Sequence, residues 1–454
     1  MLNMVNKYKT EYIGRTKELN KLIAPVFLEQ AFMVAMGMVT TILVSRVDSY
    51  ALPAVSVVDG ILNLVLAFFG ALTIGATIIV AQYTGKGDRE KASGVAAQAI
   101  VLSVGFGVIF CIVLAVFRNQ VIDLLFGSAA EGVILDARLF MGISAFSLPA
   151  VAVMLCVLGV LRGSGNTHIP MAITMIVNIV NLVLGLVLIW NFGVAGAAFA
   201  LLIARYVGAV LGLLYIIKRS LTIRFSGISS FRPNFSIQKM ILGLGLPTSV
   251  ESGTFQMGKL VITVFVAGMG TAAIASNAVI ASVSGILFSL GTVFSTGTTI
   301  LVGQRVGRGK IDDVKKTAYF TVAASMFALF IACVIIYVFM SPMLSLYEIT
   351  DEMMAILRPV IIILCIVTPI FWSASFVGPA ALRATGDVKY AMVVAIASMV
   401  FVRVALAYIL GVLLGLGILG VWLSMYADWV VRAVFFMLRI KSGKWQGRAI
   451  TNDS

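Results

Sequence analysis

The dominant feature of this sequence is a succession of twelve apolar segments, each long enough to cross a lipid bilayer as an α-helix. A membrane-spanning helix needs ~20 apolar residues, whereas strands of a membrane barrel have ~10 residues of alternating polarity. The pattern therefore predicts an all-α polytopic membrane protein. The segments lie near residues 22–45, 52–82, 92–117, 133–161, 168–190, 194–217, 241–267, 272–303, 316–340, 355–382, 388–413 and 415–438.

Composition excludes the main alternatives. Hydrophobic residues make up 61% of the 454 residues and charged residues only 11%, against about 25% charged residues in soluble domains. A soluble fold could not cover so much apolar surface with polar side chains. The single histidine, His168, leaves little material for a zinc site or a histidine-based catalytic centre. We therefore predict no metal, no cofactor and no enzymatic activity.

The distribution of basic residues predicts the orientation in the membrane. Of the 33 lysines and arginines, 25 fall in one alternating set of connections and 4 in the opposite set. Cytoplasmic loops carry such an excess, so both termini are expected in the cytoplasm of a multi-pass protein of the inner (cytoplasmic) membrane. This bias also explains the net charge of +14 without nucleic-acid binding.

The two halves of the chain are related by an internal repeat. An even number of helices per repeat preserves orientation, so we predict two parallel six-helix lobes related by an axis along the membrane normal. The predicted boundaries are 1–218 for the N-terminal lobe, 219–240 for a basic cytoplasmic linker, and 241–454 for the C-terminal lobe with its basic tail. The pairs separated by 222 residues include Pro25 and Pro247, Glu29 and Glu251, Gly75 and Gly297, and Gln82 and Gln304.

Over nearly its whole length the sequence resembles the multidrug and toxic compound extrusion (MATE) family. The resemblance rests on the repeat, on the Gln-x-x-Gly-x-Gly turn that follows helices 2 and 8, on Leu161–Asn166 and its mate Leu382–Asp387, and on GMGTAAIASNAV at 268–279. The stretch 251–259 is similar to Gram-positive bacterial members. The resemblance implies secondary active export, often of amphipathic organic cations, driven by H+ or Na+. Thr40 departs from the pattern, because many members have an aspartate there.

Three carboxylates inside the apolar segments are the candidate ion-coupling residues, namely Glu251, Asp59 and Glu29. A charge at the centre of a membrane helix costs about 2.5–3.5 kcal/mol, so such residues are retained for a reason. A carboxylate removed from water favours its neutral form, which suits proton uptake and release. Each has a structural alternative. Glu251 could be paired permanently with a neighbour, Glu29 could be an interfacial residue, and Asp59 could be a polar anchor near the mouth.

Other polar residues in the spans are candidates for a substrate cavity or a charge network. Arg403 and Asp428 are expected to form an ion pair between adjacent helices, and Lys259 to act on an acid in the C-terminal lobe or to pair with one. Arg432 is expected to reach the cytoplasmic surface. The uncharged candidates, expected to form interhelical hydrogen bonds or to line a cavity, are Asn178, Gln256, Asn277 and Thr40.

These observations predict an antiporter that works by alternating access on small-molecule substrates, in contact with membrane lipids and as a monomer. The segment 253–259 fits the start of a phosphate-binding loop, but Leu260 follows and no strand precedes it, so the energy must come from an ion gradient. A lipid-linked saccharide flippase is the alternative, favoured if Arg205, Lys259 and Arg403 face one cleft. An integral-membrane enzyme is a third hypothesis, which requires clustered acids or a metal.

Overall fold

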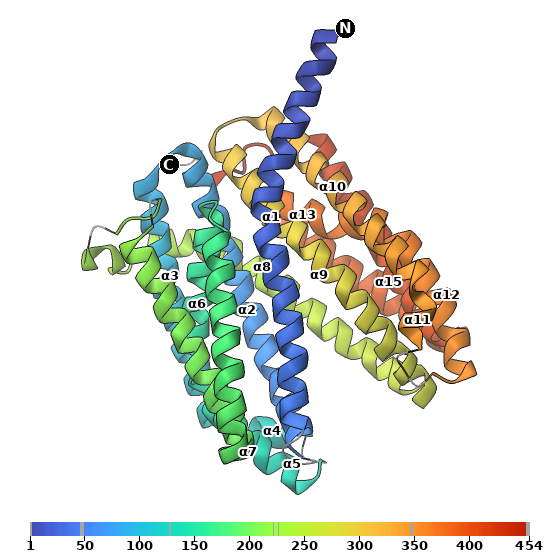
Figure 1. Ribbon diagram of the computed structural model, residues 1–454. Helices are drawn as coiled ribbons and strands as arrows, with labels where there is room; N and C mark the ends of the chain where they lie inside the picture. Colours follow the sequence, from blue (N-terminus) through green and yellow to red (C-terminus); the bar gives the residue numbers. More distant parts are fainter. Residues whose placement is uncertain are drawn as a thin grey trace. The chain divides into compact units, whose positions relative to one another are not determined.

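The computed structural model describes residues 2–45, 50–126, 129–220, 222–225, 227–345, 347 and 349–450 (Figure 1). Over these residues all regular structure is helical. The α-helices are α1 (Leu2–Ser45), α2 (Ala51–Lys86), α3 (Arg89–Val116), α4 (Arg118–Phe126), α5 (Glu131–Ala145), α6 (Leu148–Gly163), α7 (His168–Lys218), α8 (Phe235–Ala267), α9 (Thr271–Gly307), α10 (Ile311–Val338), α11 (Met340–Leu344), α12 (Asp351–Val367), α13 (Ser373–Ala384), α14 (Val388–Ala397) and α15 (Gly417–Ser442). The 3-10 helix is η1 (Ile228–Phe231), and the π-helices are η2 (Thr368–Trp372), η3 (Ser398–Val404) and η4 (Ala407–Leu413).

The helices follow the apolar segments of the sequence. Among the described residues, nine helices are long and apolar enough to cross a membrane, or ten if α5 and α6, bent by 52° at their junction, form one span. The predicted segments 168–190 and 194–217 both lie in the 51-residue α7, which breaks at Gly193 with φ 56°. Gly417, its repeat mate, has φ 57° at the start of α15. Glycine adopts this conformation without steric cost, so both repeats can turn between their last two spans.

The turn after the second helix of each repeat explains the Gly-x-Gly motif. Gly87 has a left-handed conformation with φ 84° and ends α2, and its mate Gly309 has φ 71° after α9. A glycine at this position lets the chain leave the helix without strain. In the first repeat Asp88 then begins α3 by accepting a hydrogen bond of 3.0 Å from the backbone N–H of Lys91, a standard N-cap.

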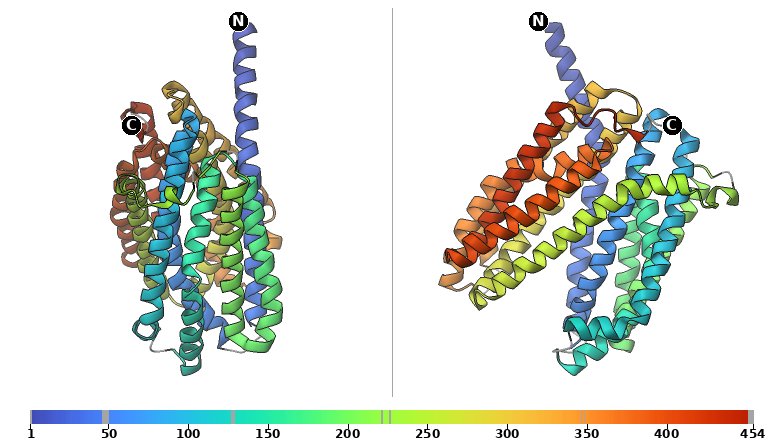
Figure 2. Two further views of the ribbon diagram at one scale, coloured as in Figure 1. Left: turned by 90° about the vertical axis from the view of Figure 1, so that its left-hand side faces the viewer. Right: turned by 180° about the vertical axis from the view of Figure 1, so that it is seen from behind.

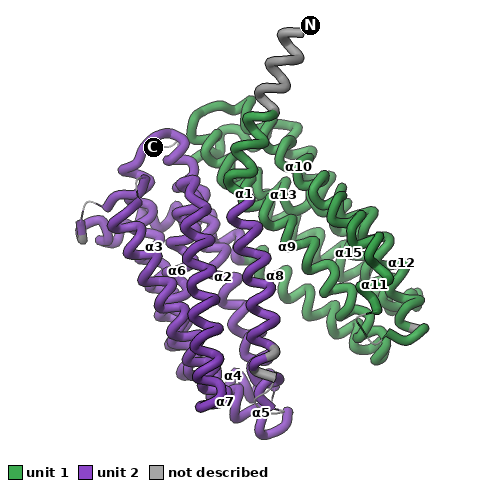
Figure 3. Tube along the Cα trace, in the orientation of Figure 1, with its two compact units in different colours: residues 1–23, 250–454 green, residues 24–249 purple. Residues whose placement is uncertain are grey.

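The chain divides into two compact units, residues 24–249 and residues 1–23 with 250–454 (Figure 3). In the first unit, α6 packs against α2, α3 and α7. In the second, α9 packs against α10, α12 and α13, and α13 packs against α15. Figure 2 shows the long helices of each unit lying side by side as a bundle. The division falls inside α1 and α8, so each unit contains the beginning of one repeat's first helix and the remainder of the other's.

In each unit, a glycine at the equivalent position of the repeat packs against the beginning of the other repeat's first helix. A Cβ atom on Gly75 of α2 would lie 2.7 Å from the carbonyl oxygen of Ile241 on α8. A Cβ atom on Gly297 of α9 would lie 2.7 Å from the side chain of Ile23 on α1, and Leu19 is its next neighbour. Only glycine allows helices to approach so closely. Because Gly75 and Gly297 are repeat mates, the first helix of each repeat packs on the second helix of the other.

The core of the unit formed by 1–23 and 250–454 is aromatic around the π-helical segment η2. The ring of Trp372 stacks on Phe376 at 4.6 Å between centroids and on Phe288 at 5.7 Å. Trp429 meets Phe288 edge to face at 5.6 Å. Such pairs contribute ~0.5–1.5 kcal/mol beyond their buried area. The π-helical turns η2 and η3 lie on the helices that surround the polar residues described below, and wide turns of this kind are frequent at functional sites.

Candidate functional site

Glu29 is buried in an ion pair at the start of the first repeat. It lies on α1 with 3% of its surface exposed. Its Oε1 accepts hydrogen bonds from Arg162, on the last turn of α6, at 2.6 Å and from the hydroxyl of Thr174, on α7, at 2.8 Å. Within the described residues Oε2 has no hydrogen-bond partner. Three helices of one unit therefore meet at this carboxylate.

Glu251 occupies the equivalent place in the second repeat. Arg383, at the end of α13, donates a hydrogen bond of 2.6 Å to its Oε1. The match is one of position as well as type, since Glu29 and Glu251 are separated by 222 residues and Arg162 and Arg383 by 221. The second pair is more open, because the Glu251 side chain is 15% exposed. It also has one donor fewer, because Ala395 stands where the repeat would place a second threonine.

These pairs answer one question that the sequence left open. Lys259 lies too far along α8 to neutralise Glu251, and the partner is instead the arginine of the Leu-Arg turn. In both repeats the glutamate of the first helix is therefore tied to the arginine of the Leu-Arg turn.

Asp59 and Arg205 form a looser arrangement in the unit 24–249. Asp59 on α2 is exposed and interacts electrostatically with Arg205 on α7. Arg205 is directed to the α5–α6 junction, where it donates a hydrogen bond of 2.6 Å to the hydroxyl of Ser147. The structure thus provides Arg205 with the partners that the sequence did not reveal. In the described part of the chain Asp59 has no salt bridge closer than 4 Å.

The predicted ion pair between Arg403 and Asp428 is wrong. Asp428 is fully buried on α15 and binds Arg432 at 2.8 Å, one helical turn further along the same helix, and also the hydroxyl of Ser398. The expectation that Arg432 reaches the cytoplasmic surface is wrong for the same reason, since only 3% of it is exposed. Residues four apart lie on one face of a helix, so Arg432 reaches the carboxylate first.

A cavity of about 350 Å³ opens inside the unit formed by 1–23 and 250–454. Two basic residues line it, Lys259 from α8 and Arg403 from η3. Asn277 of α9 also lines it and accepts a hydrogen bond of 3.1 Å from the indole N–H of Trp422, which confirms the interhelical bond expected of Asn277. The other lining residues are Ile262, Thr263, Ala281, Ser284, Gly285, Phe288, Val421 and Met425.

The other uncharged candidates do not join this cavity's lining. Thr40 donates to the carbonyl of Met36 and Asn178 to the carbonyl of Thr174, so both bonds stay within one helix. The interhelical bond expected of Asn178 is therefore wrong. Gln256 is half-buried on α8, one residue from Phe255.

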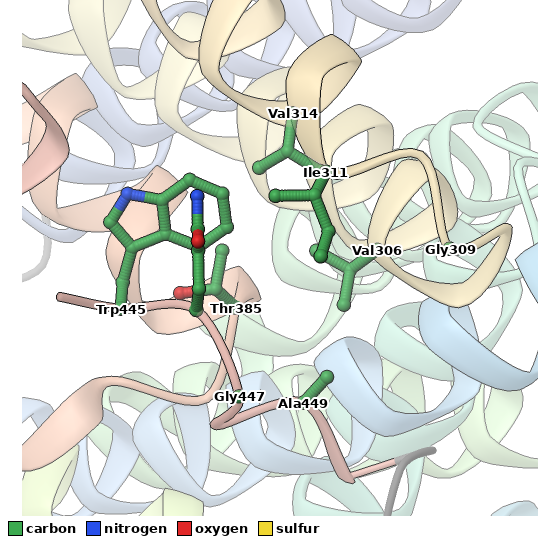
Figure 4. Close-up of a pocket in the computed structure, with 9 residues that line it drawn as sticks. Val306, Gly309, Ile311, Val314, Thr385, Trp445, Gly447 and Ala449 are labelled. Atoms are coloured by element: carbon green, nitrogen blue, oxygen red, sulfur yellow. The ribbon is translucent and has the colours of Figure 1, made fainter. Parts of the chain in front are cut away.

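A smaller cavity of about 50 Å³ lies under the C-terminal tail, where Trp445 faces Val306, Ile311 and Val314 (Figure 4). Beside it the fully buried Asp387 receives Arg439 at 2.8 Å and Arg448 at 2.6 Å. The sequence prediction missed this cluster. The available signal was an aspartate in place of Asn166 of the first repeat, together with a basic tail.

Taken together, a repeated helical membrane fold with paired buried charges and a polar cavity inside one unit defines a membrane transporter rather than a channel-forming barrel or a soluble protein. The family model MatE matches residues 25–187 and 247–409, displaced by 222 residues at both ends. The chain belongs to the MatE family, whose members are transporters and not enzymes. The predicted family, the repeat and the absence of enzymatic activity are thereby confirmed.

Individual relatives support the assignment to this family. The chain is 27% identical over 441 residues to the uncharacterized transporter YisQ of Bacillus subtilis (strain 168), covering 95% of both proteins. It is 26% identical over 440 residues to the probable multidrug resistance protein NorM of Thermotoga maritima, covering 96% of this chain and 94% of that protein. An outward-facing multidrug resistance MATE transporter of the MOP superfamily matches with a TM-score of 0.87 at 20% identity, covering 95% and 97%.

A second solved structure is a MOP superfamily transporter from Pyrococcus furiosus, described as having a binding pocket of reverse polarity that suggests a different function. It also matches with a TM-score of 0.87 at 20% identity, over 95% of this chain and 97% of that one. These likenesses confirm the predicted all-α polytopic fold of two six-helix lobes. The protein is therefore a multi-pass membrane transporter of small molecules with multidrug-efflux relatives.

Proposed function

We propose that this protein is a secondary active exporter of amphipathic small molecules, which leave the cell by alternating access in exchange for H+ or Na+ that enters. It would act as a monomer in the cytoplasmic membrane with both termini in the cytoplasm. The observation that carries the proposal is the match of one family model to both repeats at the same displacement. Two equivalent halves around a central path are the layout that alternating access needs.

We further propose that Asp59 is the main ion-coupling residue, ahead of Glu251 and Glu29. The two glutamates are bound by arginines at 2.6 Å, and leaving one member of a buried pair without its partner costs about 3–5 kcal/mol. Asp59 is exposed and faces Arg205 without a close salt bridge in the described residues. An ion that binds Asp59 would release its attraction for Arg205 and bias one conformation over the other.

Transport in everted membrane vesicles tests both statements. Substrate uptake is measured with a pH gradient or a sodium gradient imposed separately, in a host without its major efflux pumps. Asp59→Asn is expected to abolish gradient-driven uptake, whereas Glu251→Gln is expected to retain most of it. Full activity of Asp59→Asn would assign coupling elsewhere, and loss of activity only in Glu251→Gln would restore Glu251 as the coupling residue. Uptake that ignores both gradients would refute the exporter itself.

The flippase alternative is not supported. Relatives that cover most of the chain are multidrug resistance proteins, and Arg205 donates its hydrogen bond to Ser147 within the unit 24–249. The family resemblance implies organic cations as substrates, yet the described lining of the cavity in the unit formed by 1–23 and 250–454 includes lysine and arginine and no carboxylate. The charge of this cavity therefore needs its own explanation.

A further inference from the structure

The charges around Phe255 do not balance. Lys259, Arg403 and Arg432 all approach the face of this ring, at 5.1, 5.2 and 5.4 Å from its centroid to the Nζ or Cζ atom. Against these three cations stands the carboxylate of Asp428, which is already bonded to Arg432. Cation–π contact contributes ~0.5–2 kcal/mol per pair and removes no charge. The cluster thus carries a net positive charge inside an apolar helical bundle.

The two cations of this cluster without a salt bridge in the described residues line the cavity, and the one carboxylate that attracts Arg403, Asp428, is bonded to Arg432. Neither Lys259 nor Arg403 has a salt bridge in the described residues. Arg403 is only 8% exposed, and its Nε–H has no hydrogen-bond partner in the described residues. It does not bond to Oδ2 of Asp428, which also has no partner there. Lys259 and Arg403 repel each other as well. A buried guanidinium with an unused donor is costly unless a ligand completes it.

From these observations we infer that Lys259 and Arg403 form the anion-binding part of a substrate site within this cavity, and that the substrate is an amphipathic organic anion with one carboxylate or sulfonate. The inference rests on the proposed function and names its substrate class. The anionic group would receive charge-assisted hydrogen bonds from the guanidinium and the ammonium. Its counter-charge would relieve the repulsion between the two cations.

The remaining lining fits the apolar part of such a molecule. Phe288 and Trp422 provide aromatic surface, and Val421 and Met425 provide aliphatic and thioether surface. The indole N–H of Trp422 is held by Asn277, so the ring is fixed in place. A volume of about 350 Å³ lies in the range of about 300–1,000 Å³ for small-molecule pockets. One small aromatic anion is therefore the matching occupant, rather than a large lipid-linked sugar.

Binding to the purified full-length protein in detergent tests the inference without any gradient. The probes are 2-naphthalenesulfonate and the trimethyl-2-naphthylammonium ion, which share an apolar body and differ in charge, and inorganic phosphate is the third. Calorimetry is expected to show that the sulfonate binds at least tenfold more tightly than the cation, with phosphate weaker than the sulfonate. Equal or tighter binding of the cation would overturn the inference. Phosphate binding as tight as the sulfonate would overturn its amphipathic part.

Variants locate the site. Lys259→Gln and Arg403→Gln are each expected to weaken sulfonate binding about tenfold, whereas Lys389→Gln, which removes an exposed lysine of the same unit, leaves it unchanged. Lys259→Glu should reverse the preference toward the cation, and because Lys259 is exposed on α8 this variant does not depend on a buried substitution. Unchanged affinity in both Lys259 variants would refute the site. Anion binding without gradient-driven uptake would instead refute the exporter and leave the site standing.

Discussion

Removal of Arg162 is the most demanding test of the paired glutamates. Arg162→Met would leave Glu29, of which 3% is exposed, with the hydroxyl of Thr174 as its one remaining partner among the described residues. Leaving one member of a buried ion pair unpaired costs about 3–5 kcal/mol. Arg383→Met should cost less, since the side chain of Glu251 is 15% exposed and water can reach it more easily. The expected order of destabilisation is therefore Arg162→Met above Arg383→Met.

The assay is the free energy of unfolding of the purified protein in detergent, followed by denaturant titration. The double variant Glu29→Met with Arg162→Met provides the control, because replacing both partners by apolar residues of similar size is often neutral. It should recover most of the stability that Arg162→Met loses. Equal destabilisation by both single arginine variants, or a double variant no more stable than Arg162→Met, would show that the charge pair is not what holds α1, α6 and α7 together.

Two further predictions concern packing. Gly75→Val would place side-chain atoms against the backbone of Ile241, so the purified variant should not elute as a single species in size-exclusion chromatography. Gly105→Val is the control, because the space around its Cβ position is open, and it should elute normally. Normal elution of Gly75→Val would contradict the close approach of α2 and α8. Arg448→Ala removes one of the two arginines that bind the buried Asp387. It should therefore speed trypsin cleavage of the tail after Lys444. A cleavage rate equal to that of the unaltered protein would show that other contacts hold the tail.

The architecture could largely be predicted from the sequence, because an unbroken apolar run indicates a membrane helix and a constant spacing of matched residues indicates a repeat. The site could be predicted only in part. Glu29 and Glu251 were recognised as buried charges, but Arg162 lies 133 residues from Glu29, and no local pattern joins them. Their common displacement was a usable signal, since residues repeated together can also contact each other.

Other errors had a local origin. The sequence analysis places Arg432 at the cytoplasmic surface, although Asp428, four residues earlier, shares its helix face and binds it. The sequence predicts an ion pair between Arg403 and Asp428 because they lie on adjacent helices. Adjacency alone does not determine which way a side chain points, and the π-helical turn of η3 changes that direction further. In the described residues Arg403 has no salt bridge to Asp428 and lines the cavity beside Lys259, which the sequence did not indicate.

The exchange of helical beginnings between the repeats bears on how such a chain could arise. The segment before residue 24 completes the bundle of the second repeat, and residues 235–249 complete that of the first. A single-repeat ancestor would have left the groove at its equivalent of Gly75 empty, unless a second copy filled it with its own first helix. Two copies that exchanged this segment would have formed a closed dimer by domain swapping, which costs little free energy. Fusion of two such genes would then join partners that each already hold the other's first segment.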